Sequence, residues 1–300
     1  METYQPETLK ELQQVELSIL KKFDSVCRKH NLQYFLVWGS MLGALRHRGF
    51  IPWDDDIDVG MMREDYEKLK AIPREEWDDE FKLVDPNEDS FWLRFPHPRL
   101  FKLNTVFESK YHWLHDRVKN NPERIMTPIW LDIFVLDQVK SPKTCYRRWP
   151  IIFLLCKMYY WSKCRDVPHK SDSTIRKIYI LAKTCVFYLL NLVKSPELKC
   201  ARKIEELCVT APGEYVVDYY ADHKQHLSPT KREDFFPLRA IQFEDLTTWI
   251  PKNAESLMTD RYGDFMSLPP EDQRVGHLPY ILDLGDGRGK IVDMESNAER

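Results

Sequence analysis

The sequence predicts an α+β fold of α/β-like character, with a small mixed sheet flanked by helices over about the first 140 residues. Apolar residues recur at helical spacing from Leu9 to Val26, and 63–72 also has a helical pattern. Compact or alternating apolar runs indicate strands at 33–38, 57–61, 82–84, 99–103 and 129–136. Helices beside strands of one sheet are typical of a layered core.

The ends of the first elements follow from a few residues. Asn31 offers a stop for the first helix. After the strand at 33–38, Ser40 is expected to cap a helix that runs through 41–48, and Gly49 is expected to end it. A turn around Pro52 then leads into the next strand.

The segment from Lys140 to Lys203 is strongly basic. It contains fifteen Lys or Arg against three acids, a net charge of +12, so the rest of the chain carries −15. Such asymmetry indicates a surface that meets anions. The apolar runs at 151–161 and 178–193 are shorter than the roughly 20 residues that span a bilayer. Buried core helices, helices in a membrane interface and a transmembrane hairpin all stay open.

This charge shift suggests how the chain is organised. We expect a catalytic core at 1–140, a basic, apolar helical segment at 141–208, and a C-terminal part at 209–300 that completes the catalytic domain. In the last part, strands are expected within 235–243 and a helix at 252–262. The GDGRGK stretch at 285–290 lacks the spacing of a phosphate loop and is expected to be a flexible tail.

The cysteines and the N-terminus predict a cytoplasmic protein. Seven cysteines occur without a CxxC pair, which argues against a structural zinc site and a thioredoxin-like motif and favours reduced thiols. The N-terminal METYQPETLKEL lacks the apolar core of a secretory signal.

Four aspartates lie within five residues, at 54, 55, 56 and 58. Strand alternation places Asp56 and Asp58 on the same side, where they can share Mg²⁺ (or Mn²⁺) with water and substrate phosphate. Without a cation the two charges would repel each other. We therefore predict that both are metal ligands, with Asp54 and Asp55 in supporting or loop-capping roles.

Two further features complete the predicted phosphate site. Gly39 and Ser40 follow a strand at a helix N-terminus, where backbone N–H groups favour phosphate. Strand, Gly-Ser, helix and a second strand with Asp-x-Asp is the layout of the nucleotidyltransferase fold. Asp132, an acid among apolar residues, is the best candidate for a third metal-binding carboxylate, and a structural ion pair is its alternative.

Three blocks resemble a known family. The stretch GSMLGALRHRGFIPWDDDID (39–58) is similar to the signature of the LicD/fukutin-type phosphotransferases. LDIFVLD (131–137) resembles the second block of this family, and YGDFMSLPPEDQRVGH (262–277) resembles its third. The zinc-binding loop of some animal members has no counterpart here, which points to a bacterial cytoplasmic type.

The resemblance implies a nucleotidyltransferase-like core and a CDP-choline or similar CDP-alcohol donor. The acceptor would be a hydroxyl of a surface glycan or lipid-linked glycan, as in lipopolysaccharide, teichoic acid or capsule. Asp56, Asp58 and Asp132 would serve catalysis, with Asp132 either completing the metal shell or accepting the hydroxyl proton. Gly39 and Ser40 would cradle the diphosphate.

Other residues enter with less independent support. Arg46 and Arg48 would neutralise phosphate or form a solvated helix face, and His47 would orient an oxygen or lie on the surface. His277, Arg274 and Asp264 are candidate site residues only because the third block resembles that of the family.

Three other functions stay open: transfer of a nucleotide from an NTP, RNA binding by the basic segment, and a membrane scaffold built on its apolar runs. The runs do not suit a nucleic-acid groove, so no nucleic-acid partner is expected, and a scaffold leaves the aspartates unexplained. We expect the segment 141–203 to contact the inner membrane face peripherally.

Overall fold

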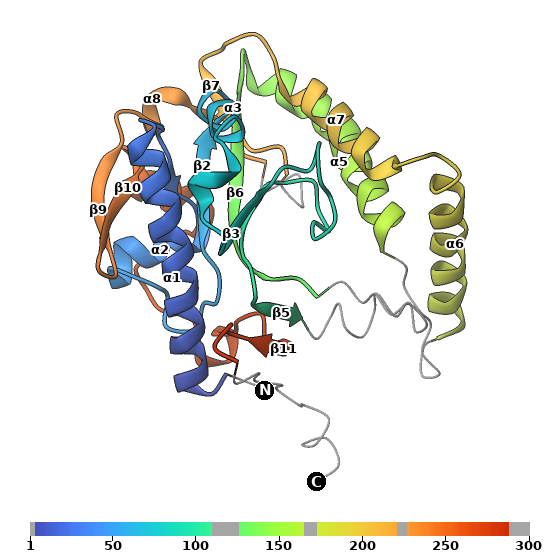
Figure 1. Ribbon diagram of the computed structural model, residues 1–300. Helices are drawn as coiled ribbons and strands as arrows, with labels where there is room; N and C mark the ends of the chain where they lie inside the picture. Colours follow the sequence, from blue (N-terminus) through green and yellow to red (C-terminus); the bar gives the residue numbers. More distant parts are fainter. Residues whose placement is uncertain (1–3, 110–125, 165–172, 221–226, 288–300) are drawn as a thin grey trace.

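The computed structural model describes residues 4–109, 126–164, 173–220 and 227–287 (Figure 1). In chain order its helices and strands are α1 (Pro6–Lys29), β1 (Phe35–Leu36), α2 (Trp38–His47), β2 (Asp58–Met62), α3 (Arg63–Lys70), η1 (Arg74–Trp77), β3 (Phe81–Val84), β4 (Arg99–Lys102), β5 (Val106–Ser109), β6 (Ile129–Val139), α5 (Pro142–Lys163), α6 (Thr174–Leu190), α7 (Pro196–Cys208), β7 (Tyr215–Val217), β8 (Thr230–Lys231), α8 (Arg232–Phe235), β9 (Arg239–Phe243), β10 (Leu246–Ile250), α9 (Ala254–Tyr262), η3 (Glu271–Gln273) and β11 (Pro279–Asp283).

A seven-stranded mixed sheet organises the molecule. Five strands lie in the order β1-β2-β6-β4-β3. Strand β7 pairs with the last residues of β6, past the part that pairs with β2, and β8 pairs with β7. The long β6 runs parallel to β2 and antiparallel to β4 and β7. The α+β class and the five strands expected in the first 140 residues are therefore confirmed.

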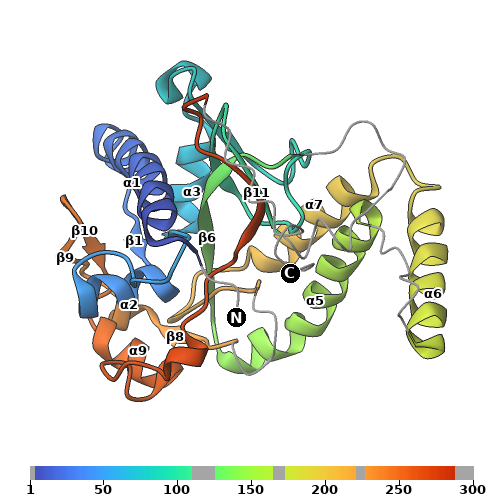
Figure 2. The same ribbon diagram turned by 90° about the horizontal axis from the view of Figure 1, so that it is seen from below.

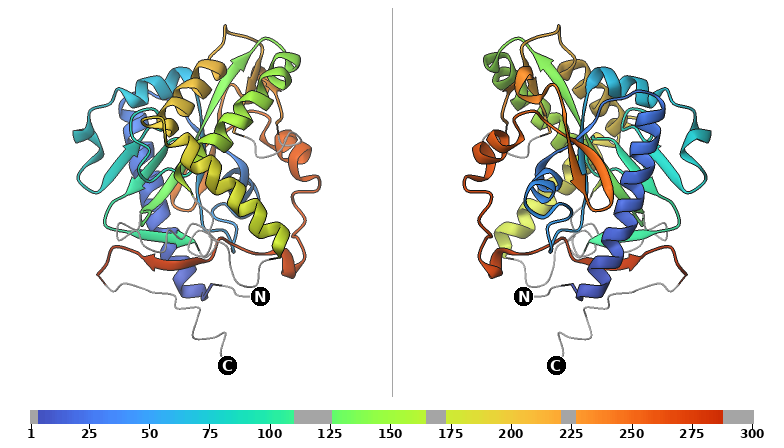
Figure 3. Two further views of the ribbon diagram at one scale, coloured as in Figure 1. Left: turned by 90° about the vertical axis from the view of Figure 1, so that its right-hand side faces the viewer. Right: turned by 90° about the vertical axis from the view of Figure 1, so that its left-hand side faces the viewer.

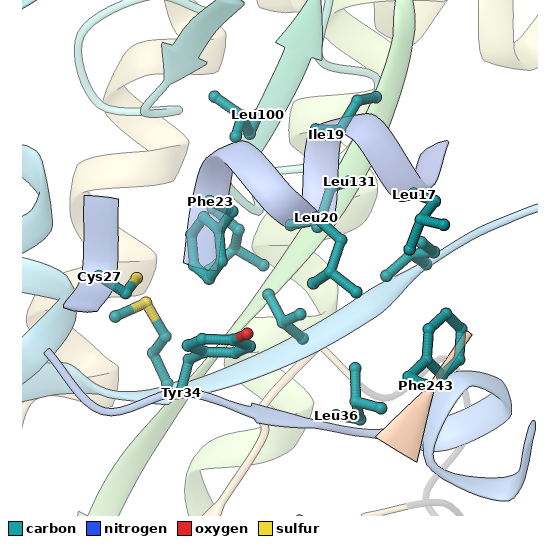
Figure 4. Packing of buried hydrophobic residues seen from close by; sticks show 14 of the residues in the cluster. Leu17, Ile19, Leu20, Phe23, Cys27, Tyr34, Leu36, Leu100, Leu131 and Phe243 are labelled. Atoms are coloured by element: carbon teal, nitrogen blue, oxygen red, sulfur yellow. The ribbon is translucent and has the colours of Figure 1, made fainter. Parts of the chain in front are cut away.

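Helix α1 covers one face of this sheet and forms the main core with it. Its apolar stripe packs on the strands, with Leu20 and Phe23 against Leu131 and Tyr34 in one buried cluster (Figure 4). Fully burying a side chain of this size contributes about 1.5–3 kcal/mol. The helix ends at Lys29, and Asn31 takes a left-handed φ of 53°, as its predicted role as a stop requires.

The expected ends of α2 are wrong in two respects. The helix begins at Trp38 with Val37 in the capping position, and Ser40 lies inside the first turn. The Ser40 hydroxyl instead accepts a hydrogen bond from the backbone N–H of Asp58 at 2.8 Å. At the other end, Arg48 rather than Gly49 takes the left-handed conformation that terminates the helix, with φ 59°.

The described residues of the basic segment form three helices beside the sheet. Helices α5 and α7 pack side by side, while α6 stands at the outer edge and packs against α5 (Figures 1 and 2). Of the two apolar runs, only the one in α5 supplies several buried side chains, among them Ile152 and Tyr159. The structure describes α6 completely, and only Ile180 of it is buried. No helix within the described residues combines the length and apolar character needed to cross a bilayer.

The C-terminal third returns to the core. Strands β9 and β10 form a hairpin beside α1 and α2, and β11 pairs with β5 below the main sheet (Figure 3). Strand β9 and helix α9 confirm the elements expected within 235–243 and at 252–262. The predicted flexible tail at 285–290 falls largely outside the described residues, which end at 287. All seven cysteines are described, and none forms a disulfide.

Candidate active site

A row of charged side chains crosses three neighbouring strands. Asp58 on β2 is paired in register with Asp132 on β6, and Asp132 is paired on its other side with Arg99 on β4. Residues paired across neighbouring strands point to the same face of a sheet, so these three side chains lie side by side. The sheet register thus brings together two acids and a cation that are far apart in sequence.

Asp132 is the most tightly held member of the row. Arg99 Nε lies 2.6 Å and His97 Nε2 2.7 Å from its Oδ1 atom, and Trp130 Nε1 donates to Oδ2 at 2.8 Å. The His97 ring is in turn stacked on Phe134 at 5.7 Å. Burial alone would raise the pKa of Asp132, but Arg99 and His97 lower it. Asp132 is therefore an ionised carboxylate whose two oxygens already accept hydrogen bonds.

The acids at 54–58 have the opposite electrostatic environment. Burial raises the pKa of Asp56, and repulsion from Asp54 raises it further. Burial also raises the pKa of Asp58, with Asp56 and Asp132 adding to the shift. For Asp54, burial and Asp55 raise the pKa to about 6. These carboxylates are crowded together, and ionising all of them without a counter-charge is unfavourable.

A divalent cation fits this crowding, with water and substrate as its remaining ligands. Within the described parts of the chain, no group of three or more His, Cys, Asp and Glu is arranged to hold a metal ion by itself. Mg²⁺ commonly uses one or two carboxylates and keeps several waters and substrate phosphate oxygens. Asp56 and Asp58 could supply such a pair, whereas Asp132 would first have to release a hydrogen-bond donor. Metal binding stays a prediction.

The first turn of α2 adjoins the acidic loop. A Cβ atom on Gly39 would lie 2.8 Å from Asp54 Oδ2, so the absence of a side chain lets that carboxylate approach the helix. Ser40 is bound to the start of β2 through the Asp58 N–H. The structure thus places Gly39 beside Asp54 and Ser40 beside the backbone of Asp58, and phosphate binding by this turn stays a prediction.

Arg46, His47 and Arg48 lie instead at the far end of α2. The Arg46 guanidinium donates to the carbonyl of Phe265 at 2.8 Å and to His47 Nε2 at 2.9 Å. Burial, together with Arg46, lowers the pKa of His47. Arg48 is exposed. In this arrangement Arg46 ties the C-terminal block to α2, and phosphate binding by the three residues stays a prediction.

Asp55 joins both ends of the chain to the acidic loop. It is 3% exposed and accepts hydrogen bonds from the Tyr4 hydroxyl at 2.5 Å and from the backbone N–H of His277. The His277 ring also lies 3.0 Å from Asp55 Oδ1, and this hydrogen bond raises the pKa of His277 to about 9. Close approach requires Gly276, where a Cβ atom would lie 2.8 Å from the Trp53 carbonyl. His277 thus enters the site, 3.8 Å from Asp56.

A cleft of about 570 Å³ opens beside these residues. Among the described residues, its lining combines four acids, three cationic or imidazole side chains, a threonine and an apolar wall: Glu16, Asp55, Asp56, Asp132, Arg94, Arg99, His277, Thr127, Phe95, Phe107, Ile129, Trp130 and Leu278. Pockets for small molecules have volumes of about 300–1,000 Å³ and mostly apolar walls with a few placed polar groups.

Sequence reasoning missed Glu16, His97, Arg99 and Trp130. Glu16 did have a signal, because it lies four residues after Leu12 and four before Leu20, in the middle of the apolar stripe of α1. Burial raises the pKa of Glu16, and Asp56 raises it further. Nothing local marked the other three, which reach the site through sheet pairing and side-chain packing.

Comparison with known proteins identifies the class. Residues 31–143, from β1 to the start of α5, match the family described as "LicD/FKTN/FKRP, nucleotidyltransferase domain". This region contains the acidic loop and the whole row from Asp58 to Arg99. Residues 31–143 therefore form a domain of the LicD/FKTN/FKRP-type family.

Individual relatives share different amounts of the chain. It is 28% identical over 286 residues to the lipopolysaccharide cholinephosphotransferase LicD of Haemophilus influenzae, covering 92% of this chain and 98% of that relative. It is 53% identical over 34 residues to the human ribitol 5-phosphate transferase FKRP, which is 11% of this chain and 7% of FKRP. An uncharacterized protein of Rickettsia prowazekii is 43% identical over 54 residues, 18% of this chain and 20% of that protein.

Proposed function

We propose that the protein transfers phosphocholine or a related phospho-alcohol from a CDP-linked donor to a hydroxyl of a cell-surface glycan. We propose that this transfer requires a divalent cation. The observation that carries this proposal is the row of Asp58, Asp132 and Arg99 beside the crowded acidic loop, where Asp132 and Arg99 line a cleft of about 570 Å³. The names of the Haemophilus and human relatives support transfer of a phospho-alcohol to a glycan. The CDP donor and the cation go beyond what these names say and are part of the proposal.

The proposed reaction exchanges one phosphorus–oxygen bond for another. The acceptor hydroxyl oxygen forms a bond to the phosphorus that carries the alcohol, and the bond from that phosphorus to the bridging oxygen breaks. CMP departs with that oxygen and its electron pair, and the hydroxyl proton passes to a carboxylate of the cleft. Such transfers depend mainly on positioning and on neutralising charge.

The residues of the cleft divide this work. Arg94 and Arg99 line it and would face a diphosphate while they are paired with Glu108 and Asp132. We assign Asp132 the role of holding Arg99 and His97 in place, because its lowered pKa makes it a poor proton acceptor. Asp56 and Asp58 would hold Mg²⁺ or Mn²⁺, which when bound stabilises negative charge on the diphosphate. Gly39 and Ser40 would lie beside the phosphates.

Release of CMP tests the proposed function. We expect the purified protein to release CMP from one or more of a panel of CDP-alcohols, including CDP-choline and CDP-ribitol, when Mg²⁺ and an acceptor glycan are present. EDTA should stop the release and added Mg²⁺ should restore it. Parallel reactions with NTPs test nucleotide transfer, and pyrophosphate release from an NTP without CMP release from any CDP-alcohol would contradict the proposal.

An exposed apolar face on α6 bears on where this reaction takes place. Ile175, Ile178, Leu181 and Leu189 are 63–81% exposed. Their spacing places them on one side of the helix, away from Ile180, the buried residue that faces the protein. Side chains of this size are normally buried, so a contiguous face of them marks an interaction surface.

We propose that this face, the α6 surface, lies in the interface of an anionic membrane, at the inner leaflet where a lipid-linked acceptor would reside. The charge of the surrounding segment favours this partner, because 140–203 carries +12 and the rest of the chain −15. Basic residues near an anionic surface contribute about 1 kcal/mol each. An amphipathic helix with basic flanks binds in this way without spanning the bilayer.

Vesicle binding with a matched variant tests the α6 surface. The protein should co-sediment with phosphatidylcholine vesicles that contain phosphatidylglycerol and much less with pure phosphatidylcholine. The double variant Leu181→Asp/Leu189→Asp should weaken this binding by at least about tenfold, because each buried leucine contributes about 1.5–3 kcal/mol. Val209→Asp, at an exposed position outside α6, should bind like the unmodified protein. The proposal would be overturned if the double variant bound the anionic vesicles as well as Val209→Asp does. It would also be overturned if the protein self-associated through α6 without binding vesicles.

A further inference from the structure

Glu16 is a buried carboxylate in the middle of an apolar helix face. Its residue is 3% exposed, and its neighbours on the face, Leu12 and Leu20, are fully buried in the main core. Its Oε2 atom is also buried and has no hydrogen-bond partner among the described residues. Burying a carboxylate without a partner is costly, so a residue of this kind in a core stripe requires an explanation.

The surroundings of Glu16 indicate what the missing partner is. Glu16 lines the same cleft as Asp55, Asp56 and His277. Tyr4 and His277 direct their hydrogen bonds to Asp55, and the Arg99 guanidinium is bound to Asp132. Glu16 therefore adds one more carboxyl group to the cleft beside Asp55 and Asp56, where a cation would stabilise its ionised form.

We infer that Glu16 is a further residue of the cation site, where its carboxylate accepts hydrogen bonds from the water shell of a divalent ion held by Asp56 and Asp58. This inference rests on the metal dependence of the proposed function. An indirect role fits because no three ligand-type side chains among the described residues are arranged to bind a metal directly. Mg²⁺ usually keeps several of its waters, and such waters need acceptors.

Affinity for a metal ion, measured without turnover, tests this inference. Free Mn²⁺ is followed by electron paramagnetic resonance during titration of the protein, with and without CMP. We expect Glu16→Gln to weaken Mn²⁺ binding by about 10–100-fold, the usual effect of removing a group that supports metal ligands indirectly. Glu7→Gln removes a negative charge from an exposed position of the same helix and should change the affinity by less than about twofold.

Thermal denaturation separates the cation-site role from a purely structural one. Without metal, Glu16→Gln should unfold at the same temperature as the unmodified protein or higher, because it removes a charge that faces other acids. Lower thermal stability with unchanged Mn²⁺ affinity would mean that Glu16 is structural, and it would overturn the inference while leaving the proposed function intact. If the unmodified protein binds no Mn²⁺ with or without CMP, the metal dependence of the proposed function fails and this inference fails with it.

Discussion

Asp58→Asn is expected to lower the rate of phospho-alcohol transfer by about 10²–10³-fold, the loss typical when one group that stabilises charge in a transition state is removed. Asp58 begins β2, lies in register with Asp132 and is one of the two carboxylates proposed to hold the cation. The amide keeps the shape of the side chain but removes its negative charge. CMP release from the preferred CDP-alcohol measures the effect.

The same variant should not unfold more easily. Burial and Asp56 raise the pKa of Asp58 above its ordinary 3.8. A carboxyl whose pKa is raised by folding favours the folded state most below its unfolded pKa, and this contribution is lost as pH rises. At pH 7 Asp58→Asn should therefore denature at an equal or higher temperature, and Mg²⁺ should stabilise it less than the unmodified protein.

Asp78→Asn is the matched control for this experiment. Asp78 is an exposed aspartate whose carboxylate pairs with Lys22 at 2.6 Å, and it does not belong to the described lining of the cleft. Exposed ion pairs contribute about 0–1 kcal/mol, so its turnover should stay within about twofold of the unmodified protein. If Asp58→Asn releases CMP as fast as this control, Asp58 is not a metal ligand.

Asp132→Ala is expected to lower the free energy of unfolding by about 3–5 kcal/mol, because removing one partner of a buried ion pair leaves the other charge uncompensated. The uncompensated charge is Arg99, whose side chain is only 12% exposed. Urea denaturation measures the loss. The double variant Asp132→Ala/Arg99→Met should recover part of it, because it removes both charges.

The stabilisation by Asp132 should also depend on pH in a predictable direction. Arg99 and His97 lower the pKa of Asp132 below its ordinary 3.8, against the effect of burial. The folded chain then holds the Asp132 proton less readily than the unfolded chain, so its stabilisation is present above pH 3.8 and is lost as the pH falls below it. The acid limb of the stability curve should therefore be shallower in Asp132→Ala.

Asp245→Ala is the control for stability. Asp245 pairs with Lys21 at 2.6 Å, but its side chain is 68% exposed, and the change should cost less than about 1 kcal/mol. A loss of that small size for Asp132→Ala would show that Asp132 is not the buried anchor of Arg99 and His97.

Local patterns in the sequence determined much of this protein. The stripe of α1 reflects a period of 3.6, and the alternation of Asp58 and Val59 in β2 reflects a period of 2.0. The long apolar run of β6 is continuous, and like the other two patterns it is read within one element. The acidic loop was evident for the same reason, because four carboxylates within five residues must affect one another whatever the fold. These features needed no information from distant parts of the chain.

The tertiary structure alone decided how those elements meet. The register between β2, β6 and β4 places Asp132 between Asp58 and Arg99, and a slip of one residue would point them to opposite faces. Packing of α5 and α7 left α6 outside, although the apolar runs of α5 and α6 look alike in the sequence. Pairings of this kind are set by the shape and burial of the whole molecule, and a single residue such as Asp132 carries no local mark of the partners that folding brings to it.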